Sequence, residues 1–283
     1  SLMEAGSHKD LGQAVTAAVD THAHVTLNDF DVDRDSVIAR ARSLGVSFVE
    51  IGFDVESSRK SVSLARDLGG KCAVGIHPHN ASDFIGALPA AWRQIEDLAV
   101  NNREVVAVGE MGLDFARDFS PRDLQEDCFL LGIETAKRTG LTVVIHQRDA
   151  EERVLSMLRA AALKAPIIFH CFSGNPVYAE RCLELGGYIG LGGSLTYPKN
   201  DLARDAVKVM PLDRILLETD CPYLAPQTMR GKRNEPALVL EVARAVAEIR
   251  DISLDLVLHA TAVNAKAAFL GTDVSFPRDH TLG

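Results

Sequence analysis

The chain has 283 residues, of which 47% are hydrophobic and 24% are charged, and its formal net charge at pH 7 is -9. This negative balance disfavours a protein that coats nucleic acid nonspecifically, because that mode needs a broad lysine and arginine surface, although a local basic groove stays possible. No window approaches the roughly 18 uninterrupted apolar residues of a membrane helix, so no membrane partner is expected.

The first residues are expected to lie outside the folded domain. Residues 1–13 begin with Ser1 and carry Met3 inside, which indicates an N-terminal extension that partly precedes the natural start. Residues 14–283 show no linker composition and are expected to form one domain. The five cysteines include no C-x-x-C pair, which favours reduced thiols and a cytoplasmic location.

Eight short apolar runs alternate with longer amphipathic segments along the chain. The predicted strands lie within residues 14–24, 46–54, 72–78, 105–114, 141–149, 166–174, 187–195 and 214–224. The predicted helices cover residues 33–44, 57–68, 89–101, 121–139, 149–163, 175–186, 201–210, 236–250 and 253–270. Strands that are apolar throughout indicate a parallel sheet buried on both faces. Eight strand-helix units therefore predict a single (β/α)₈ TIM barrel, with an open doubly wound sheet as the alternative.

Ionisable side chains recur where the predicted strands end. In the segment DTHAH, His22 and His24 share one face of an extended strand and can grip a divalent metal together. Five further strands end in similar residues: His77, His79, Glu110, Asp114, His146, His170, Glu218 and Asp220. The carboxyl ends of barrel strands meet at one rim, where this architecture builds its active sites. So many buried ionisable groups are costly without a cation, which favours a metal site over structural histidines.

The donor types indicate which metals fit. Four histidines with two carboxylates suit Zn²⁺, Mn²⁺, Fe²⁺ or Ni²⁺, with Mg²⁺ also considered, better than a dedicated Ca²⁺ cage. The candidate ligands are His22, His24, Glu110, His146, His170 and Asp220. Six ligands exceed one tetrahedral ion, so we expect two divalent ions roughly 4 Å apart that share Glu110. Asp20 lies on the same strand face and is expected to fix the tautomer of an imidazole, with capping of the strand end as the alternative.

Seven segments, taken in order, resemble the signature blocks of the TatD family of metal-dependent hydrolases, within the amidohydrolase superfamily. They are DTHAH, GIHPHN, VGEMGLDF, VIHQRDA, FHCFSG, GLGGSLTYPKN and LLETDCPYLAP with RGKRNEP. The resemblance extends from about residue 20 to the final predicted helix. It implies a TIM barrel, a pair of divalent metals and a nuclease of the 3′-to-5′ exonuclease or DNase kind, while some relatives are credited with deacylating D-aminoacyl-tRNA.

The same resemblance implies a role for each candidate residue. His22, His24 and Asp220 would hold one metal. His146 and His170 would hold the other, with Glu110 shared, and His77 would line the substrate pocket. Divalent cations lower the pKa of bound water and so provide the nucleophile. Asp220 is expected to accept the proton of the attacking water and return it to the leaving group, which makes Asp220 and Glu110 the candidate catalytic residues.

Basic residues follow the last predicted strand. Arg230, Lys232 and Arg233 lie within four positions of one another, and Arg148 follows His146 in another segment. Charged loops are usually just solvated. Next to a metal site, however, arginine suits bidentate phosphate contacts and lysine suits point-charge contacts, so these four residues are predicted to bind substrate.

The expected activity is that of a metal-dependent phosphodiesterase, a 3′-to-5′ exonuclease on single-stranded DNA. A barrel rim admits one strand more easily than a duplex. The alternatives are a D-aminoacyl-tRNA deacylase, a small-molecule amidohydrolase or lactonase with the same metals, and a noncatalytic metal-binding scaffold. The ligand set does not choose among these enzymes, because the same nucleophile attacks carbonyl carbon or phosphorus. A monomer or weak oligomer is expected.

Overall fold

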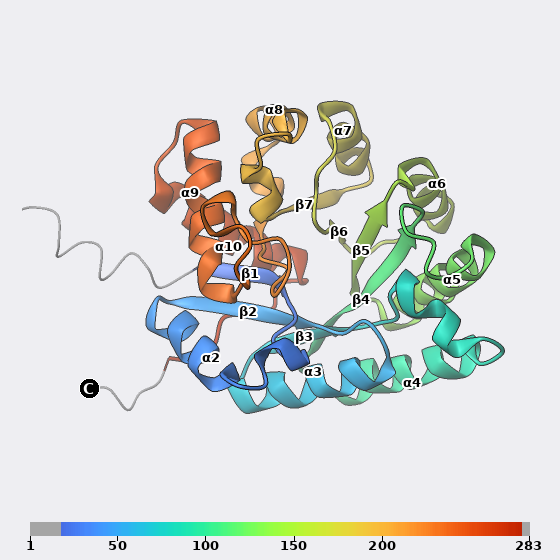
Figure 1. Ribbon diagram of the computed structural model, residues 1–283. Helices are drawn as coiled ribbons and strands as arrows, with labels where there is room; N and C mark the ends of the chain where they lie inside the picture. Colours follow the sequence, from blue (N-terminus) through green and yellow to red (C-terminus); the bar gives the residue numbers. More distant parts are fainter. Residues whose placement is uncertain (1–17, 279–283) are drawn as a thin grey trace, which may run out of the picture.

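The computed structural model describes residues 18–278 of the chain (Figure 1). Eight parallel strands pair in sequence order, and the helices surround them (Figure 1). This sheet forms a nearly closed barrel, so the predicted (β/α)₈ fold is confirmed. The alternative of a doubly wound sheet is wrong, because its strand order would reverse at a switch point. The expected extension at residues 1–13 lies outside the described residues.

The barrel strands differ in length. They are β1 (Ala18–Ala23), β2 (Val46–Ile51), β3 (Lys71–Val74), β4 (Val105–Asp114), β5 (Thr142–Arg148), β6 (Ile167–Phe169), β7 (Gly187–Leu191) and β8 (Ile215–Leu217). The helices are α2 (Arg34–Ser43), α3 (Val55–Leu68), α4 (Leu88–Asn101), α5 (Arg122–Thr139), α6 (Glu151–Ala161), α7 (Pro176–Glu184), α8 (Asp201–Val209), α9 (Val239–Arg250) and α10 (Leu254–Ala268). Short 3₁₀ segments lie in the loops: η1 (Asn28–Phe30), η2 (Pro78–Phe84), η3 (Gly193–Thr196), η4 (Leu212–Arg214), η5 (Gln227–Met229) and η6 (Pro236–Leu238).

The apolar strand residues form two separate layers of core. Val143 and Ile145 of β5 belong to the large cluster that includes the surrounding helices. Val144, which lies between them, belongs to a second cluster with Ile168 and Leu216 of other strands. Successive side chains of a strand point to opposite faces, so the second cluster fills the barrel interior. Burial on both faces explains why the strands read as continuous apolar runs.

The barrel closes where β8 meets β1, and we call this junction the β8–β1 seam. The carboxylate of Asp20 accepts two hydrogen bonds from Thr219, from its backbone N–H at 2.9 Å and from its hydroxyl at 2.5 Å. The hydroxyl of Thr21 donates to the carbonyl of Leu217 at 3.0 Å. Nearer the rim, the backbone N–H of Asp220 donates to the carbonyl of His22 at 2.8 Å. The seam therefore fixes the last strand end against the first.

The strands β4 and β5 continue to pair as far as Asp114 and Arg148, at the rim. Gly112 makes this close pairing possible. A Cβ at Gly112 would lie 1.8 Å from the carbonyl oxygen of His146, and its φ of 150° is one that other residues rarely adopt. Glycine at this position therefore allows β4 to approach β5 where both strands carry candidate ligands.

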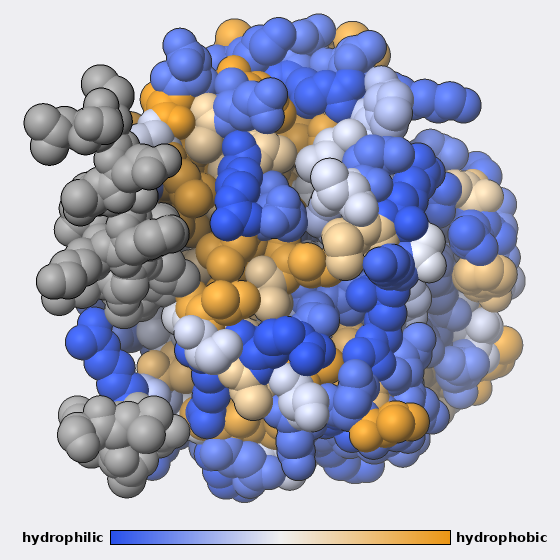
Figure 2. Space-filling model, turned by 60° about the vertical axis from the view of Figure 1, so that its left-hand side comes forward, coloured by the Kyte–Doolittle hydropathy of each residue, from blue (hydrophilic) through white to orange (hydrophobic). Residues whose placement is uncertain are grey.

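Hydrophilic residues cover most of the face shown in Figure 2, and hydrophobic residues gather near its middle. No helix within residues 18–278 combines the length and apolar character needed to cross a bilayer.

The predicted free thiols are confirmed: Cys72, Cys128, Cys182 and Cys221 are buried, and Cys171 is partly buried.

Candidate metal centre

The structure brings the six predicted metal ligands together at the rim. His22 lies in β1 and His24 directly after it, Glu110 lies in β4 and His146 in β5. The other two ligands, His170 and Asp220, follow the ends of β6 and β8. Because the strands are parallel and adjacent, their carboxyl ends deliver these side chains to one place. Four of the six residues are buried, and His146 and Asp220 are partly exposed.

The carboxylate of Glu110 lies between two groups of donors. Its Oε1 is 3.1 Å from His22 Nε2 and 3.6 Å from His24 Nε2. Its Oε2 is 3.0 Å from His146 Nδ1 and 3.3 Å from His170 Nε2. Each oxygen of one carboxylate thus faces a different pair of imidazoles.

Asp220 completes the group on the Oε1 side. Its Oδ1 lies 3.5 Å from His22 Nε2 and 3.3 Å from His24 Nε2. Its Oδ2 lies 3.9 Å from His170 Nε2, so the side chain also borders the other group. The side chain of Asp220 is 14% exposed, compared with 4% for Glu110. Of the two carboxylates, Asp220 is the more accessible from solvent.

Two imidazoles are held by acceptors behind them. The Nδ1–H of His24 donates to the carbonyl of Ile51 at 2.8 Å, which leaves its Nε2 lone pair directed into the centre. His170 Nδ1 lies 2.8 Å from Glu218 Oε2 in the same arrangement. Glu218 also accepts a hydrogen bond from the backbone N–H of Cys171. Such outer acceptors fix the tautomer and orientation of metal-binding histidines.

The expectation for Asp20 is wrong. Its carboxylate accepts hydrogen bonds from the backbone N–H of His22 at 3.1 Å and from Thr219, and from no imidazole among the described residues. The side chain lies one strand layer deeper than the rings, because residues on one face also differ in depth along the barrel axis. Ile51 and Glu218 orient the imidazoles instead. The position of Glu218 two residues before Asp220 was its only signal in the sequence.

The donor set fits a divalent cation. His22 Nδ1 is buried and makes no hydrogen bond to the rest of residues 18–278. The rings of His22 and His170 stack with centroids 3.5 Å apart and planes 9° apart, so two positive charges there would repel strongly. Neutral imidazoles and ionised carboxylates at this spacing are the ligands that Zn²⁺ and similar ions prefer.

The carboxylates of the centre stay ionised. Burial alone would raise the pKa of Glu110, but His170, His77 and His22 around it hold that pKa well below its usual range. Burial and the carboxylates act in opposite directions on His24 as well. There Asp220 and Glu110 prevail and raise the pKa of the imidazole to about 9, so a divalent cation would displace a proton from His24 when it binds. The negative charge is therefore available to balance a cation.

A second chain of polar contacts adjoins the centre. Asp114 Oδ2 lies 2.9 Å from His146 Nε2 and 2.9 Å from His79 Nε2. His77, predicted to line the pocket, has its Nε2 3.3 Å from Glu110 Oε2. Its Nδ1 accepts a hydrogen bond from the backbone N–H of His79 at 3.0 Å. The sequence showed His79 and Asp114 only as strand-end residues, without their link to His146.

The predicted phosphate-binding residues differ in their surroundings. Arg233 pairs with Asp33 through both terminal nitrogens, at 2.9 and 2.6 Å, and lies over the ring of Phe30. Arg230 lies 4.2 Å from the centroid of the Tyr197 ring and is exposed. Lys232 and Arg148 are exposed as well. The head group of Arg233 is therefore occupied by a carboxylate, whereas the other three reach solvent.

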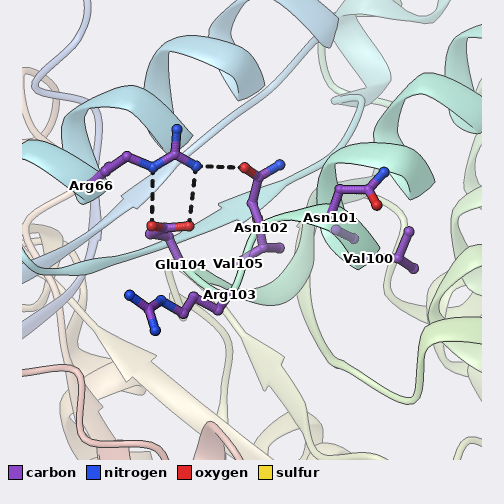
Figure 3. A pocket seen from close by; sticks show the side chains of 8 residues that line it. Arg66, Val100, Asn101, Asn102, Arg103, Glu104 and Val105 are labelled. Carbon is purple, nitrogen blue, oxygen red and sulfur yellow. Dashed lines mark hydrogen bonds and ion pairs between the residues drawn. The ribbon is translucent and has the colours of Figure 1, made fainter.

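A hollow of about 550 Å³ lies elsewhere, between α3, the end of α4 and the start of β4 (Figure 3). Arg66 points across it and bonds Glu104 at 3.2 Å and Asn102 at 2.6 Å (Figure 3). The start of β4 is the end of the barrel opposite the ligands. None of the possible metal-holding groups within the described part of the chain includes a residue of this hollow.

Known proteins resemble this chain over most of its length. The family model described as TatD related DNase matches residues 19–270. YabD of Bacillus subtilis, named an uncharacterized metal-dependent hydrolase, is 38% identical over 253 residues, covering 88% of this chain and 98% of YabD. The 3′-5′ ssDNA/RNA exonuclease TatD of Erwinia amylovora is 36% identical over 260 residues, covering 88% and 98%.

Solved structures show the same likeness. The TatD homologue YjjV from Escherichia coli matches with a TM-score of 0.84 and 29% identity, over 90% of this chain and 99% of YjjV. A TatD family hydrolase from Entamoeba histolytica matches with a TM-score of 0.82 and 20% identity, over 91% and 99%. At 20% identity the second match shows the fold alone.

Proposed function

The chain belongs to the TatD family of metal-dependent hydrolases, and from that premise we propose that it is a 3′-to-5′ exonuclease acting on single-stranded DNA. The observation that carries the proposal is the placement of Glu110, whose two oxygens face two separate groups of imidazoles at the barrel rim. A relative named 3′-5′ ssDNA/RNA exonuclease, 36% identical over 98% of its own length, supports the substrate.

We propose further that the residues at the rim hold two divalent metal ions. His22, His24 and Asp220 would hold one ion on the Oε1 side of Glu110. His146 and His170 would hold the other on the Oε2 side. Zn²⁺, Mn²⁺, Mg²⁺, Fe²⁺ and Ni²⁺ all accept nitrogen and oxygen donors of this kind. When bound, such ions polarise a phosphoryl oxygen and make water a stronger acid.

Asp220 is the residue proposed to move the proton. Despite burial, His170 and His24 lower the pKa of its carboxyl, so it is ionised at neutral pH and can accept a proton. It is also more exposed than Glu110, so it can reach a water that attacks the phosphorus. The same carboxyl would return the proton to the leaving 3′ oxygen. Glu110 has a different task, because each of its two oxygens contacts one group of imidazoles and so holds the two groups next to each other.

Substrate phosphates would contact the exposed cations of the rim. Arg148 at the end of β5 and Arg230 and Lys232 after β8 are proposed to bind them, with His77 beside Glu110 lining the pocket. Arg233 would act indirectly, because its pair with Asp33 ties the basic loop to the segment before α2.

The test is hydrolysis of a 5′-labelled single-stranded oligonucleotide, in parallel with a misacylated tRNA, with Mg²⁺, Mn²⁺ or Zn²⁺ added. We expect a ladder that shortens from the 3′ end. Asp220→Asn is expected to lower kcat by about a thousand-fold, because the proton acceptor is lost. The control is Asp213→Asn, an exposed aspartate at the other end of β8. Deacylation of the tRNA without oligonucleotide cleavage by the parent protein would assign the centre to the other reaction.

A further inference from the structure

Two exposed aromatic side chains stand at the rim on opposite sides of the candidate metal centre. Phe119, between β4 and α5, is 57% exposed, and Tyr223, after β8, is 54% exposed. Strands β4 and β8 are four positions apart in a ring of eight, so the loops that follow them face each other across the barrel mouth. Within residues 18–278, these two are the only aromatic members of the exposed large hydrophobic side chains.

Each of these aromatic rings contacts an imidazole of the centre or its neighbour. The ring of Tyr223 meets that of His24 at 63°, with centroids 6.4 Å apart. The ring of Phe119 meets that of His79 at 89°, with centroids 4.8 Å apart. His79 shares the carboxylate of Asp114 with His146. Both aromatic rings are thus positioned against the site while much of their surface stays open to solvent.

Each of the two loops that carry these aromatic rings also carries an arginine. The guanidinium of Arg117 lies 5.7 Å from the centroid of the Phe119 ring. In the loop that carries Tyr223, Arg230 lies over the ring of Tyr197, which itself follows β7. Aromatic faces beside cations are the combination with which proteins bind single-stranded nucleic acid, because bases stack on the rings and phosphates meet the charges.

We propose that Tyr223 and Phe119 are stacking platforms for the nucleobases on the two sides of the scissile phosphodiester. This inference rests on the proposed function and names how the same site selects its substrate. A base on each platform would hold the phosphate between them over the metal ligands. Stacking does not depend on base identity, since every base has a π face, so the platforms select single strands without selecting sequence. A paired duplex keeps its bases stacked on one another and cannot use both platforms.

The test compares two oligonucleotides of equal length, one intact and one with abasic sugars at its last two 3′ positions. Tyr223→Ala and Phe119→Ala are each expected to raise KM for the intact strand about ten-fold, with kcat changed less than two-fold. On the abasic strand the variants should match the parent, since no base is present to stack. Tyr223→Phe keeps the ring and should recover most of the affinity that Tyr223→Ala loses.

Val100→Ala is the control, because Val100 is 62% exposed on α4 at the other end of the barrel. Metal content and thermal unfolding should be unchanged in all variants, since both aromatic side chains are exposed. Equal losses on intact and abasic strands, or no loss on either, would overturn the stacking role while leaving the exonuclease in place. If the parent cleaves no oligonucleotide, the proposed function and this inference fall together.

Discussion

Asp114 orients the ring of His146, a candidate metal ligand, although Asp114 is not itself among the six candidate ligands. Its Oδ2 is shared by His146 and His79, and its Oδ1 accepts the backbone N–H groups of Ala116 and Arg117. These four hydrogen bonds hold the carboxylate rigidly. The ring of His146 is thereby turned so that Nδ1, its other nitrogen, faces Glu110.

Asp114→Asn is expected to weaken metal binding about 10- to 100-fold, because the two backbone N–H groups keep the amide oxygen at the Oδ1 position and leave the imidazoles facing a nitrogen that cannot accept a hydrogen bond. Competition with a chromophoric chelator measures the affinity. Asp118→Asn is the matched control in the same loop, since Asp118 is exposed and pairs only with Arg122 among the described residues. If both variants bind the metal as tightly as the parent, Asp114 does not position His146.

For single residues, the sequence predicts which side chains lie at the same rim of the barrel, but it does not predict the hydrogen-bond partner of each. His22, Glu110 and His146 were placed at one rim because strand ends converge there, and the structure brings them together. The prediction for Asp20 fails because the alternation of side chains along a strand shows which face a residue occupies but not how deep it lies along the barrel axis. The pairing of Arg233 with Asp33 joins positions 200 apart, and nothing local in the sequence signals such a contact.

At the scale of single elements, apolar runs located all eight strands, while element ends depended on local contacts. The helix expected to start at residue 57 begins at Val55 instead. Asp54 caps it by accepting a hydrogen bond from the backbone N–H of Ser57 at 2.7 Å, and Ser57 Oγ accepts one from the backbone N–H of Asp54 at 3.0 Å. The sequence placed Asp54 in the preceding strand, because its apolar run continues up to that residue.

The β8–β1 seam yields a prediction about strand docking. Thr219→Val keeps the shape of the side chain but leaves a buried oxygen of Asp20 without its hydroxyl partner. We expect the free energy of unfolding in urea to fall by about 1–3 kcal/mol. The control is Thr261→Val, because the buried hydroxyl of Thr261 donates only to carbonyls of its own helix, those of Val257 and Leu258. If both variants lower the free energy of unfolding equally, the hydrogen bond between Thr219 and Asp20 stabilises the protein no more than an ordinary bond to a helix carbonyl.

For the whole molecule, buried carboxyl groups make stability depend on pH. Burial raises the pKa of Glu50 to about 7, although it accepts the backbone N–H groups of Val25 and Thr26. Its folded pKa exceeds its unfolded value, so the folded state binds the proton more tightly. The contribution of Glu50 to stability is therefore fully present below about pH 4 and is lost as the pH rises through about 7.

Glu50→Gln removes this ionisation. We expect the stability of the variant relative to the parent protein to rise by about 2 kcal/mol from pH 5 to pH 8, on top of a pH-independent cost from the amide nitrogen that replaces one acceptor oxygen. Urea unfolding at four pH values across this range measures the difference. Glu56→Gln is the control, because the side chain of Glu56 is 78% exposed beside Lys60. A pH-independent difference between Glu50→Gln and the parent would mean that Glu50 is already ionised in the folded protein at pH 5.

The overall architecture was readable from the sequence because eight apolar runs, each followed by a helix, leave few ways to bury both faces of a sheet. The closure of the ring was not readable in the same way. It depends on hydrogen bonds of Asp20, Thr21 and Thr219 that join the first strand to the last, and no local pattern in the sequence signals these contacts.

The seam also sets the order in which the protein can become active. Asp20 and Thr219 are 199 positions apart, so the first histidines leave the ribosome long before the strand that brings Asp220 beside them. Domains generally fold as units. A nascent chain or a fragment ending before β8 therefore holds scattered imidazoles without a complete centre. Only a chain that includes β8 can bring all six candidate ligands together, because Asp220 follows that strand.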